Sequence, residues 1–166
     1  MDRSPLRRTR AYIGLGANLG DARAALEAAC AELQHLPRTH WVGRSRFYRS
    51  APVDSHGPDY VNAAAAVDTG LEPLALLEAL LEIEQLHGRQ RPYVNAPRTL
   101  DLDLLLYGDL QCSTDARLIL PHPRGHLRAF VLQPLAELAP DLLWPGLGAI
   151  RPLLTAVSCQ SLQRLE

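Results

Sequence analysis

Two aspartates near residue 100 are the side chains best suited to chemistry in this sequence. Asp101 and Asp103 are separated by one residue, and leucines fill the alternate positions 100, 102, 104 and 106. Successive side chains of a strand point to opposite faces, so we expect the leucines to face a core and both carboxylates to share the other face, with Cα atoms about 7 Å apart. Paired carboxylates repel unless a cation lies between them, and hard oxygen ligands suit Mg²⁺. The same alternation is also typical of a strand with one solvated face, so the pattern alone leaves both interpretations open.

Basic side chains gather in the sequence on both sides of the acidic pair. They are Arg89, Arg91 and Arg98 before it and Arg117, His122, Arg124, His126 and Arg128 after it. Guanidinium groups bind phosphate oxygens through two parallel hydrogen bonds. The set therefore favours a metal-bound triphosphate, although any one of these arginines alone is equally typical of a solvated surface.

Four further side chains would suit a bound small molecule. Glu84 lies in phase with the leucines of a helical stripe, where a carboxylate is costly unless something binds it; an edge position open to solvent fits the pattern equally well. Tyr60 and Asn62 lie two residues apart in a predicted strand, so an aromatic ring and an amide would share a face and could bind a heterocycle. Core packing is the alternative for both, and for Phe130 the sequence alone favours it.

The glycine-rich segment from Gly14 to Gly20 does not fit the common nucleotide-binding motifs. A dinucleotide fingerprint needs a small residue at position 19, which is leucine, and no acidic residue closes the second predicted strand. Neither GxxxxGKS nor GxxxxGKT occurs, so the sequence excludes a P-loop kinase.

Composition and charge narrow the class of protein. Lys and Arg total 17 against 18 Asp and Glu, so the whole-chain field does not favour a polyanion, and we expect no nucleic-acid partner. The three cysteines have no disulfide or metal-binding spacing, which fits a reducing compartment. No apolar run approaches the roughly 20 residues of a membrane span, and no apolar segment of signal type follows the basic start. We expect a cytoplasmic protein with no membrane partner, and a monomer.

The elements that must position these residues follow the order strand, helix, strand, strand, helix, strand. Strands are predicted over residues 10–15, 41–48, 60–68 and 100–107, helices over 21–36 and 73–87, and polar loops over 50–58 and 89–97. Beyond residue 107 we expect irregular chain to His126, a short helix to Leu132 and a last helix opened by Pro152.

This order is typical of an α+β protein with a ferredoxin-like, split βαβ core, in which helices pack on a mostly antiparallel sheet. We expect residues 1–10 to form a ragged basic tail and residues 11–166 a single catalytic domain.

Five stretches taken together resemble one enzyme family. They are AYIGLGAN at 11–18, YRS at 48–50, PDYVN at 58–62, RTLDLD at 98–103 and PH at 121–122. As a set they resemble the 6-hydroxymethyl-7,8-dihydropterin pyrophosphokinase family of folate synthesis, over about residues 11–143. The resemblance implies that ATP gives its β,γ-pyrophosphoryl group to the hydroxymethyl oxygen of the dihydropterin and leaves as AMP.

The resemblance also implies roles for individual residues. Asp101 and Asp103 would bind two Mg²⁺ ions, and Arg89 and Arg98 would stabilise the transferring phosphates as catalytic residues. The positions implied for ATP are Glu84, Arg89, Arg91, Arg98, Leu104, Arg117, Ile119, His122 and Arg128. Those implied for the pterin are Ser50, Ala51, Val53, Tyr60, Asn62 and Phe130.

The chain departs from the family pattern in the loop before the aspartates. Asn95 stands where the family often has a tryptophan, and small and proline residues surround it. We expect the loop 89–97 to act as a lid that orders when both substrates bind. Two alternatives stay open at this point: a nucleotidyl transferase or cyclase with paired metal-binding aspartates, and a non-catalytic ferredoxin-like module that binds a ligand.

Overall fold

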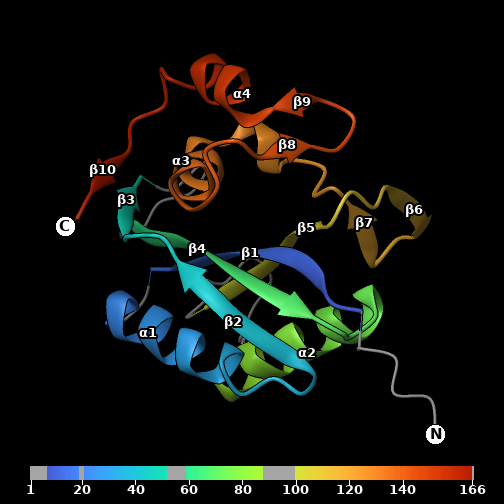
Figure 1. Ribbon diagram of the computed structural model, residues 1–166. Coiled ribbons are helices and arrows are strands. Elements are labelled where there is room, and N and C mark those ends of the chain that lie inside the picture. The colour runs from blue at the N-terminus through green and yellow to red at the C-terminus, as the bar shows by residue number, and fades with distance from the viewer. Residues whose placement is uncertain (1–6, 19–20, 52–58, 88–99, 166) are drawn as a thin grey trace, which may run out of the picture.

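An antiparallel sheet forms the middle layer of the protein (Figure 1). The computed structural model describes residues 7–18, 21–51, 59–87 and 100–165. The sheet consists of β1 (Thr9–Ala17), β2 (Thr39–Arg44), β3 (Tyr48–Ser50), β4 (Tyr60–Thr69), β5 (Asp101–Tyr107) and β10 (Gln163–Arg164). Its order is β10-β3-β4-β1-β5, with β2 also paired to β4. β4 separates β1 from β2, and β1 separates β4 from β5, which is the split βαβ arrangement. The predicted ferredoxin-like fold is therefore confirmed.

Two helices cover one face of the sheet, drawn below it in Figure 1. They are α1 (Ala22–Leu33) and α2 (Pro73–Leu86). Asp21 caps α1, because its Oδ1 accepts a hydrogen bond of 3.0 Å from the N–H of Ala24. Pro73 opens α2, where its missing N–H costs nothing. Helix and sheet leucines, isoleucines and alanines bury a continuous lower core between these layers.

The opposite face carries the C-terminal third of the chain (Figure 1). The 3₁₀ turn η1 (Gly125–Leu127) leads into α3 (Ala129–Leu138), and a hairpin of β8 (Leu143–Trp144) and β9 (Gly148–Ala149) leads into α4 (Ile150–Ala156). Ala64 and Ala66 of β4 face this layer, and their small side chains let α3 lie close to the sheet. Trp144, Leu132 and Leu135 fill the upper core. No helix in the described ranges is long and apolar enough to cross a membrane.

The C-terminal half differs from the sequence prediction in three places. Residues 107–126 are not all irregular, because β6 (Cys112–Asp115) and β7 (Leu118–Leu120) form a hairpin beside β5. The short helix predicted from His126 to Leu132 is a 3₁₀ turn followed by the longer α3. The last helix begins at Ile150 rather than at Pro152, because a proline is tolerated anywhere in a first turn that has no N–H partners to lose.

The second predicted strand is also two strands. Ser45 interrupts it, since its N–H donates to the carbonyl of Ala64 and its Oγ accepts from the N–H of Ala64. The hydroxyl of Ser45 thus replaces one backbone acceptor in the pairing with β4, and the next strand, β3, begins at Tyr48.

Candidate active site

The acidic pair lies on β5, the last strand in the described order of the sheet, beside two glycines of β1. The register of β5 with β1 places Asp101 beside Gly16 and Asp103 beside Gly14. Leu102 and Leu104 point into the lower core, so both carboxylates lie on the face that α3 covers. The prediction that the carboxylates share a face opposite these leucines is confirmed. Since glycine has no side chain, the space between the carboxylates and β4 is left open, and both aspartates line a cavity of about 220 Å³.

Leu106 is an exception to the predicted alternation. The ladder between β1 and β5 shifts by one residue between Tyr12 and Ile13, so that Leu105 is an extra residue. Both Leu105 and Leu106 pack in the upper core. The prediction that Leu106 shares the face of Leu104 is wrong, because the bulge reverses the alternation beyond that point.

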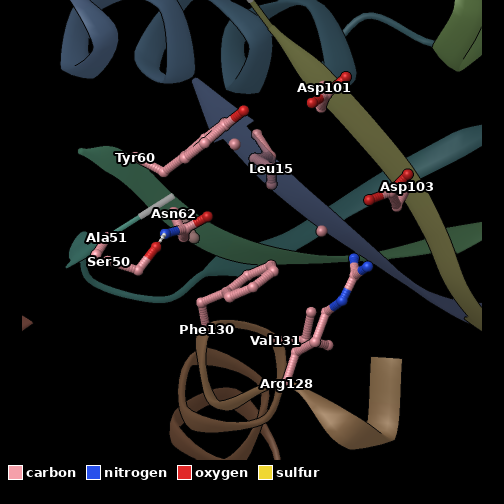
Figure 2. Close-up of a pocket in the computed structure, with 13 residues that line it drawn as sticks. Leu15, Ser50, Ala51, Tyr60, Asn62, Asp101, Asp103, Arg128, Phe130 and Val131 are labelled. Carbon is pink, nitrogen blue, oxygen red and sulfur yellow. Dashed lines mark hydrogen bonds between the residues drawn. The ribbon is translucent and has the colours of Figure 1, made fainter. Parts of the chain in front are cut away.

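A polar wall faces the acidic pair across the cavity. Asn62 of β4 is 4% exposed and lies in register with Gly16, one strand away from Asp101. Its Nδ2 donates a hydrogen bond of 2.7 Å to Oγ of Ser50, which Figure 2 shows as a dashed line. Tyr60 and Ala51 complete this side of the cavity. An oriented amide next to an aromatic ring can recognise the edge of a flat heterocycle.

Helix α3 supplies the roof of the cavity. Arg128 and Phe130 extend from the start of the helix toward the sheet (Figure 2). The guanidinium carbon of Arg128 lies 5.5 Å from the ring centroid of Phe130. Phe130 therefore lines the cavity rather than serving only as core, and it shares this cavity with the amide of Asn62.

His122 lies close to this acidic and basic cluster. Its backbone N–H donates to the carbonyl of Leu105, and its Nδ1 accepts a hydrogen bond of 3.1 Å from the N–H of Arg124. Burial lowers the pKa of His122, and the charges of Arg128 and Arg124 lower it further, against the opposing effect of Asp103. The ring is therefore neutral near pH 7, with its proton on Nε2, which makes Nε2–H a fixed donor.

Of the six described residues predicted to contact ATP, only Arg128 lines the cavity, while His122 and the four residues that follow do not. Glu84 is 4% exposed on the lower side of the sheet, where its Oε1 accepts a hydrogen bond of 3.4 Å from the N–H of Leu102. Leu104 is buried in the lower core. Arg117 forms an ion pair of 3.1 Å with Asp115 in the β6–β7 hairpin, and Ile119 is exposed in β7. These residues lie around β5 and the neighbouring hairpin, so contact with ATP there would require a nucleotide that extends beyond the cavity.

Some predicted residues lie outside the described part of the chain. They are Val53, Arg89, Arg91 and Arg98, together with the predicted lid.

A family comparison identifies the protein. Residues 12–140 match the model of 7,8-dihydro-6-hydroxymethylpterin-pyrophosphokinase (HPPK). The chain belongs to the HPPK family. The chain is 45% identical to the 2-amino-4-hydroxy-6-hydroxymethyldihydropteridine pyrophosphokinase of Methylorubrum extorquens over 159 residues, which cover 95% of this chain and 99% of the relative. The enzyme of the same name from Pseudomonas aeruginosa is also 45% identical, over 94% of this chain and 96% of its own.

Solved structures show the same fold. A crystal structure of Plasmodium falciparum HPPK-DHPS superposes on 93% of this chain with a TM-score of 0.73 at 15% sequence identity. This chain spans 46% of that longer protein. The resemblance to the pyrophosphokinase family and the ferredoxin-like architecture are thus both borne out.

Sequence reasoning missed the two glycines that shape the HPPK cavity. The sequence analysis used Gly14 and Gly16 as a motif that fails the dinucleotide spacing and as part of the family-like stretch at 11–18, and it assigned them no role in shaping a cavity. A β carbon on Gly16 would lie 3.3 Å from Oδ1 of Asn62, and one on Gly14 would lie 3.4 Å from the side chain of Leu105. Their role depends on the register of β1 with β4 and β5, which the sequence does not state.

Proposed function

We propose that this protein transfers the pyrophosphoryl group of ATP to the hydroxymethyl oxygen of 6-hydroxymethyl-7,8-dihydropterin and releases AMP, in tetrahydrofolate biosynthesis. The observation that supports this most strongly is the shared cavity: Asp101 and Asp103 line the same space as the oriented amide of Asn62 and the ring of Phe130. A site that joins a polyphosphate to a heterocycle needs both halves within reach of each other.

The pterin fits the half of the cavity formed by β3, β4 and α3. The cavity is smaller than the roughly 300–1,000 Å³ of sites for drug-sized ligands, which suits one bicyclic ring. Asn62 would pair with donors and acceptors of the ring edge, and Phe130 and Tyr60 would contact its faces. The hydroxymethyl group would then point toward β5. Ser50, Ala51 and Val53 complete the proposed pterin site.

The acidic pair fits a Mg²⁺ site. Two carboxylates on one strand face supply hard oxygen donors, and Gly14 and Gly16 leave the space beside them clear. No group of three or more acidic, histidine or cysteine side chains within the described residues could hold a metal. Two protein carboxylates with the remaining ligands from substrate phosphates and water is the usual Mg²⁺ arrangement, and we propose two such ions here. When bound, Mg²⁺ would neutralise phosphate charge and lower the pKa of the attacking alcohol.

The protein's own groups would position the phosphates and exclude water. Arg128 directs its guanidinium into the cavity that Asp103 also lines. His122 interacts electrostatically with both Asp103 and Arg128, and its Nε2–H would donate to a phosphate oxygen. Pyrophosphoryl transfer needs positioning and charge stabilisation more than a protein base, so the proposed reaction assigns no side chain as general base. Glu84, Arg91, Leu104, Arg117 and Ile119 belong to the proposed ATP site.

Two arginines outside the described residues complete the proposal. Arg89 and Arg98 would act as catalytic residues on the transferring phosphates, and residues 89–97 as a lid. A monomeric, cytoplasmic enzyme without nucleic-acid or membrane partners also remains part of the proposal.

Product analysis separates this function from its two alternatives. The purified protein is incubated with ATP, Mg²⁺ and 6-hydroxymethyl-7,8-dihydropterin, and the nucleotide products are resolved by chromatography. AMP formed only when the pterin is present supports pyrophosphoryl transfer. Release of inorganic pyrophosphate would indicate a nucleotidyl transferase or cyclase, and absence of turnover would indicate a binding module.

A further inference from the structure

The start of α3, which forms the roof of the cavity, has no capping side chain at its N-cap residue. Arg128 lies between η1 and α3 with an extended backbone (φ −128°, ψ 121°), and its side chain makes no capping hydrogen bond to the helix. The side chain instead points into the cavity. A helix start without a capping side chain leaves backbone N–H groups that need partners from elsewhere.

Gln160, in the C-terminal segment, supplies the partner of one such N–H group. Its Oε1 accepts a hydrogen bond of 2.9 Å from the N–H of Ala129, and its Nε2 donates one of 2.9 Å to the carbonyl of Leu127. These two backbone groups are the carbonyl before Arg128 and the N–H after it. The side-chain amide of Gln160 therefore hydrogen-bonds to the backbone on both sides of Arg128, a pair of contacts called the backbone grip below.

The same segment is attached to the opposite wall of the cavity. Gln163 and Arg164 form β10, which pairs with Arg49 and Tyr48 of β3, and the N–H of Leu165 donates to the carbonyl of Phe47 over 3.0 Å. β3 ends at Ser50, the hydrogen-bond partner of Asn62. Residues 160–165 thus connect the strand that orients the polar wall to the helix start that forms the roof.

We propose that Gln160 is a positioning residue for the transfer reaction, which acts through the backbone of Arg128 and secondarily through Phe130. This role rests on the function proposed above. Gln160 lies outside residues 12–140 that match the family. Its contacts fix where the guanidinium of Arg128 meets the phosphates, and a misplacement of roughly 1 Å in such a group can cost on the order of 100-fold in rate.

The test compares Gln160→Met with Gln163→Met. Methionine keeps the length of glutamine and removes both hydrogen bonds, and Gln163 is an exposed residue of the same type in the same segment. Dissociation constants for Mg²⁺–ATP are measured without pterin, so that no turnover occurs, and each change is repeated with Arg128→Ala. We expect Gln160→Met to raise the ATP dissociation constant about five- to ten-fold when Arg128 is present and less than about two-fold when it is absent. Gln163→Met should match the wild type.

A merely stabilising role would give a different result. Gln160→Met would then lower the unfolding midpoint, and its effect on ATP binding would be the same with and without Arg128, which would overturn the proposal. Equal binding by Gln160→Met and Gln163→Met would also overturn it.

Amide hydrogen exchange separates failure of this inference from failure of the proposed function. The N–H of Ala129 should exchange faster in Gln160→Met than in Gln163→Met, and this readout requires no substrate. If the wild type binds neither ATP nor pterin, the proposed function fails, while selective loss of Ala129 protection still supports the backbone grip by Gln160. Unchanged protection of Ala129 would refute the grip itself.

Discussion

Asn62 and Ser50 are joined by a hydrogen bond of 2.7 Å from Nδ2 to Oγ, and this contact holds the amide of Asn62 over Gly16. The two residues come from neighbouring strands, β3 and β4, so the orientation of the amide depends on the pairing of those strands. A buried amide with one fixed donor has its remaining donor and its carbonyl directed by the same contact.

Replacing Asn62 by alanine should weaken pterin binding selectively. The pterin donors and acceptors that pair with the amide would lose their partners, at a cost of about 1–3 kcal/mol. Titration calorimetry should therefore show a pterin dissociation constant raised about 5- to 150-fold with nearly unchanged ATP binding. Ser50→Ala should have a smaller effect in the same direction. Loss of ATP binding with intact pterin binding would mean that the two halves of the site are assigned the wrong way round.

Gly16→Ala should also impair the pterin site. The new β carbon would lie 3.3 Å from Oδ1 of Asn62, which is tighter than ordinary van der Waals contact, so the amide must rotate or shift. Gly43→Ala is the matched control, because a β carbon there meets no atom within 4 Å. We expect pterin affinity to fall several-fold, about 1 kcal/mol, in Gly16→Ala alone. Equal pterin affinity in the two variants would contradict the proposed position of the ring.

The acidic pair should be essential for turnover and dispensable for folding. Asp101→Asn and Asp103→Asn keep the side-chain size and remove the charge that binds a cation, so we expect each to lose at least about 100-fold in rate, with a far-ultraviolet circular dichroism spectrum like that of the wild type. Asp109→Asn changes an exposed aspartate just beyond β5 and serves as control. Near-normal rates for both site variants at moderate Mg²⁺ would refute the metal assignment.

Tyr48 should make the free energy of unfolding depend on pH in the alkaline range. Burial and the hydrogen bond of 2.6 Å from its hydroxyl to Glu137 raise the pKa of Tyr48 from 10 to about 12. The folded protein therefore holds this proton more tightly than the unfolded chain does. The resulting stability is complete below pH 10 and is lost as the pH rises toward 12.

The free energy of unfolding by urea is measured between about pH 8 and about pH 12. This range includes the ordinary pKa of the Tyr48 hydroxyl and its raised value. Tyr48→Phe should be less stable than the wild type at pH 8 by about 0.5–1.5 kcal/mol, and the difference should shrink at the alkaline end. Tyr107→Phe, which removes a hydroxyl that donates to the carbonyl of Leu71, controls for the loss of a hydrogen-bonded tyrosine hydroxyl. A constant difference between wild type and Tyr48→Phe across the range would contradict the linkage.

The sequence predicted the parts of the fold that depend on local pattern. The alternation around Asp101 and Asp103 placed both carboxylates on one face, and Asp21 and Pro73 marked the starts of two helices correctly. The sequence did not predict features that depend on how one strand pairs with another. The bulge at Leu105 follows from the register of β5 on β1, and the break at Ser45 follows from a side chain that bonds to Ala64.

The same distinction applies to the site. Tyr60 and Asn62 carried a signal because an aromatic ring and an amide at strand spacing suit a heterocycle. For Phe130 the residue pattern favoured core packing, and only the family resemblance implied a place in the pterin site. The structure brings all three to one cavity. Gly14 and Gly16 contributed to the family resemblance but gave no signal of their role in the cavity, because that role is to leave space beside the aspartates. Gln160 belongs to no periodic pattern, and only the fold brings it to the start of α3.

Isotope transfer tests the central claim most directly. ATP labelled with ³²P in the α, β or γ position is reacted with Mg²⁺ and 6-hydroxymethyl-7,8-dihydropterin in a single turnover, and pterin and nucleotide products are separated. Pyrophosphoryl transfer predicts that the β and γ labels both appear in the pterin product, in equal amounts, while the α label stays in AMP. Transfer of the γ label alone, or release of β and γ labels as free pyrophosphate, would contradict the account.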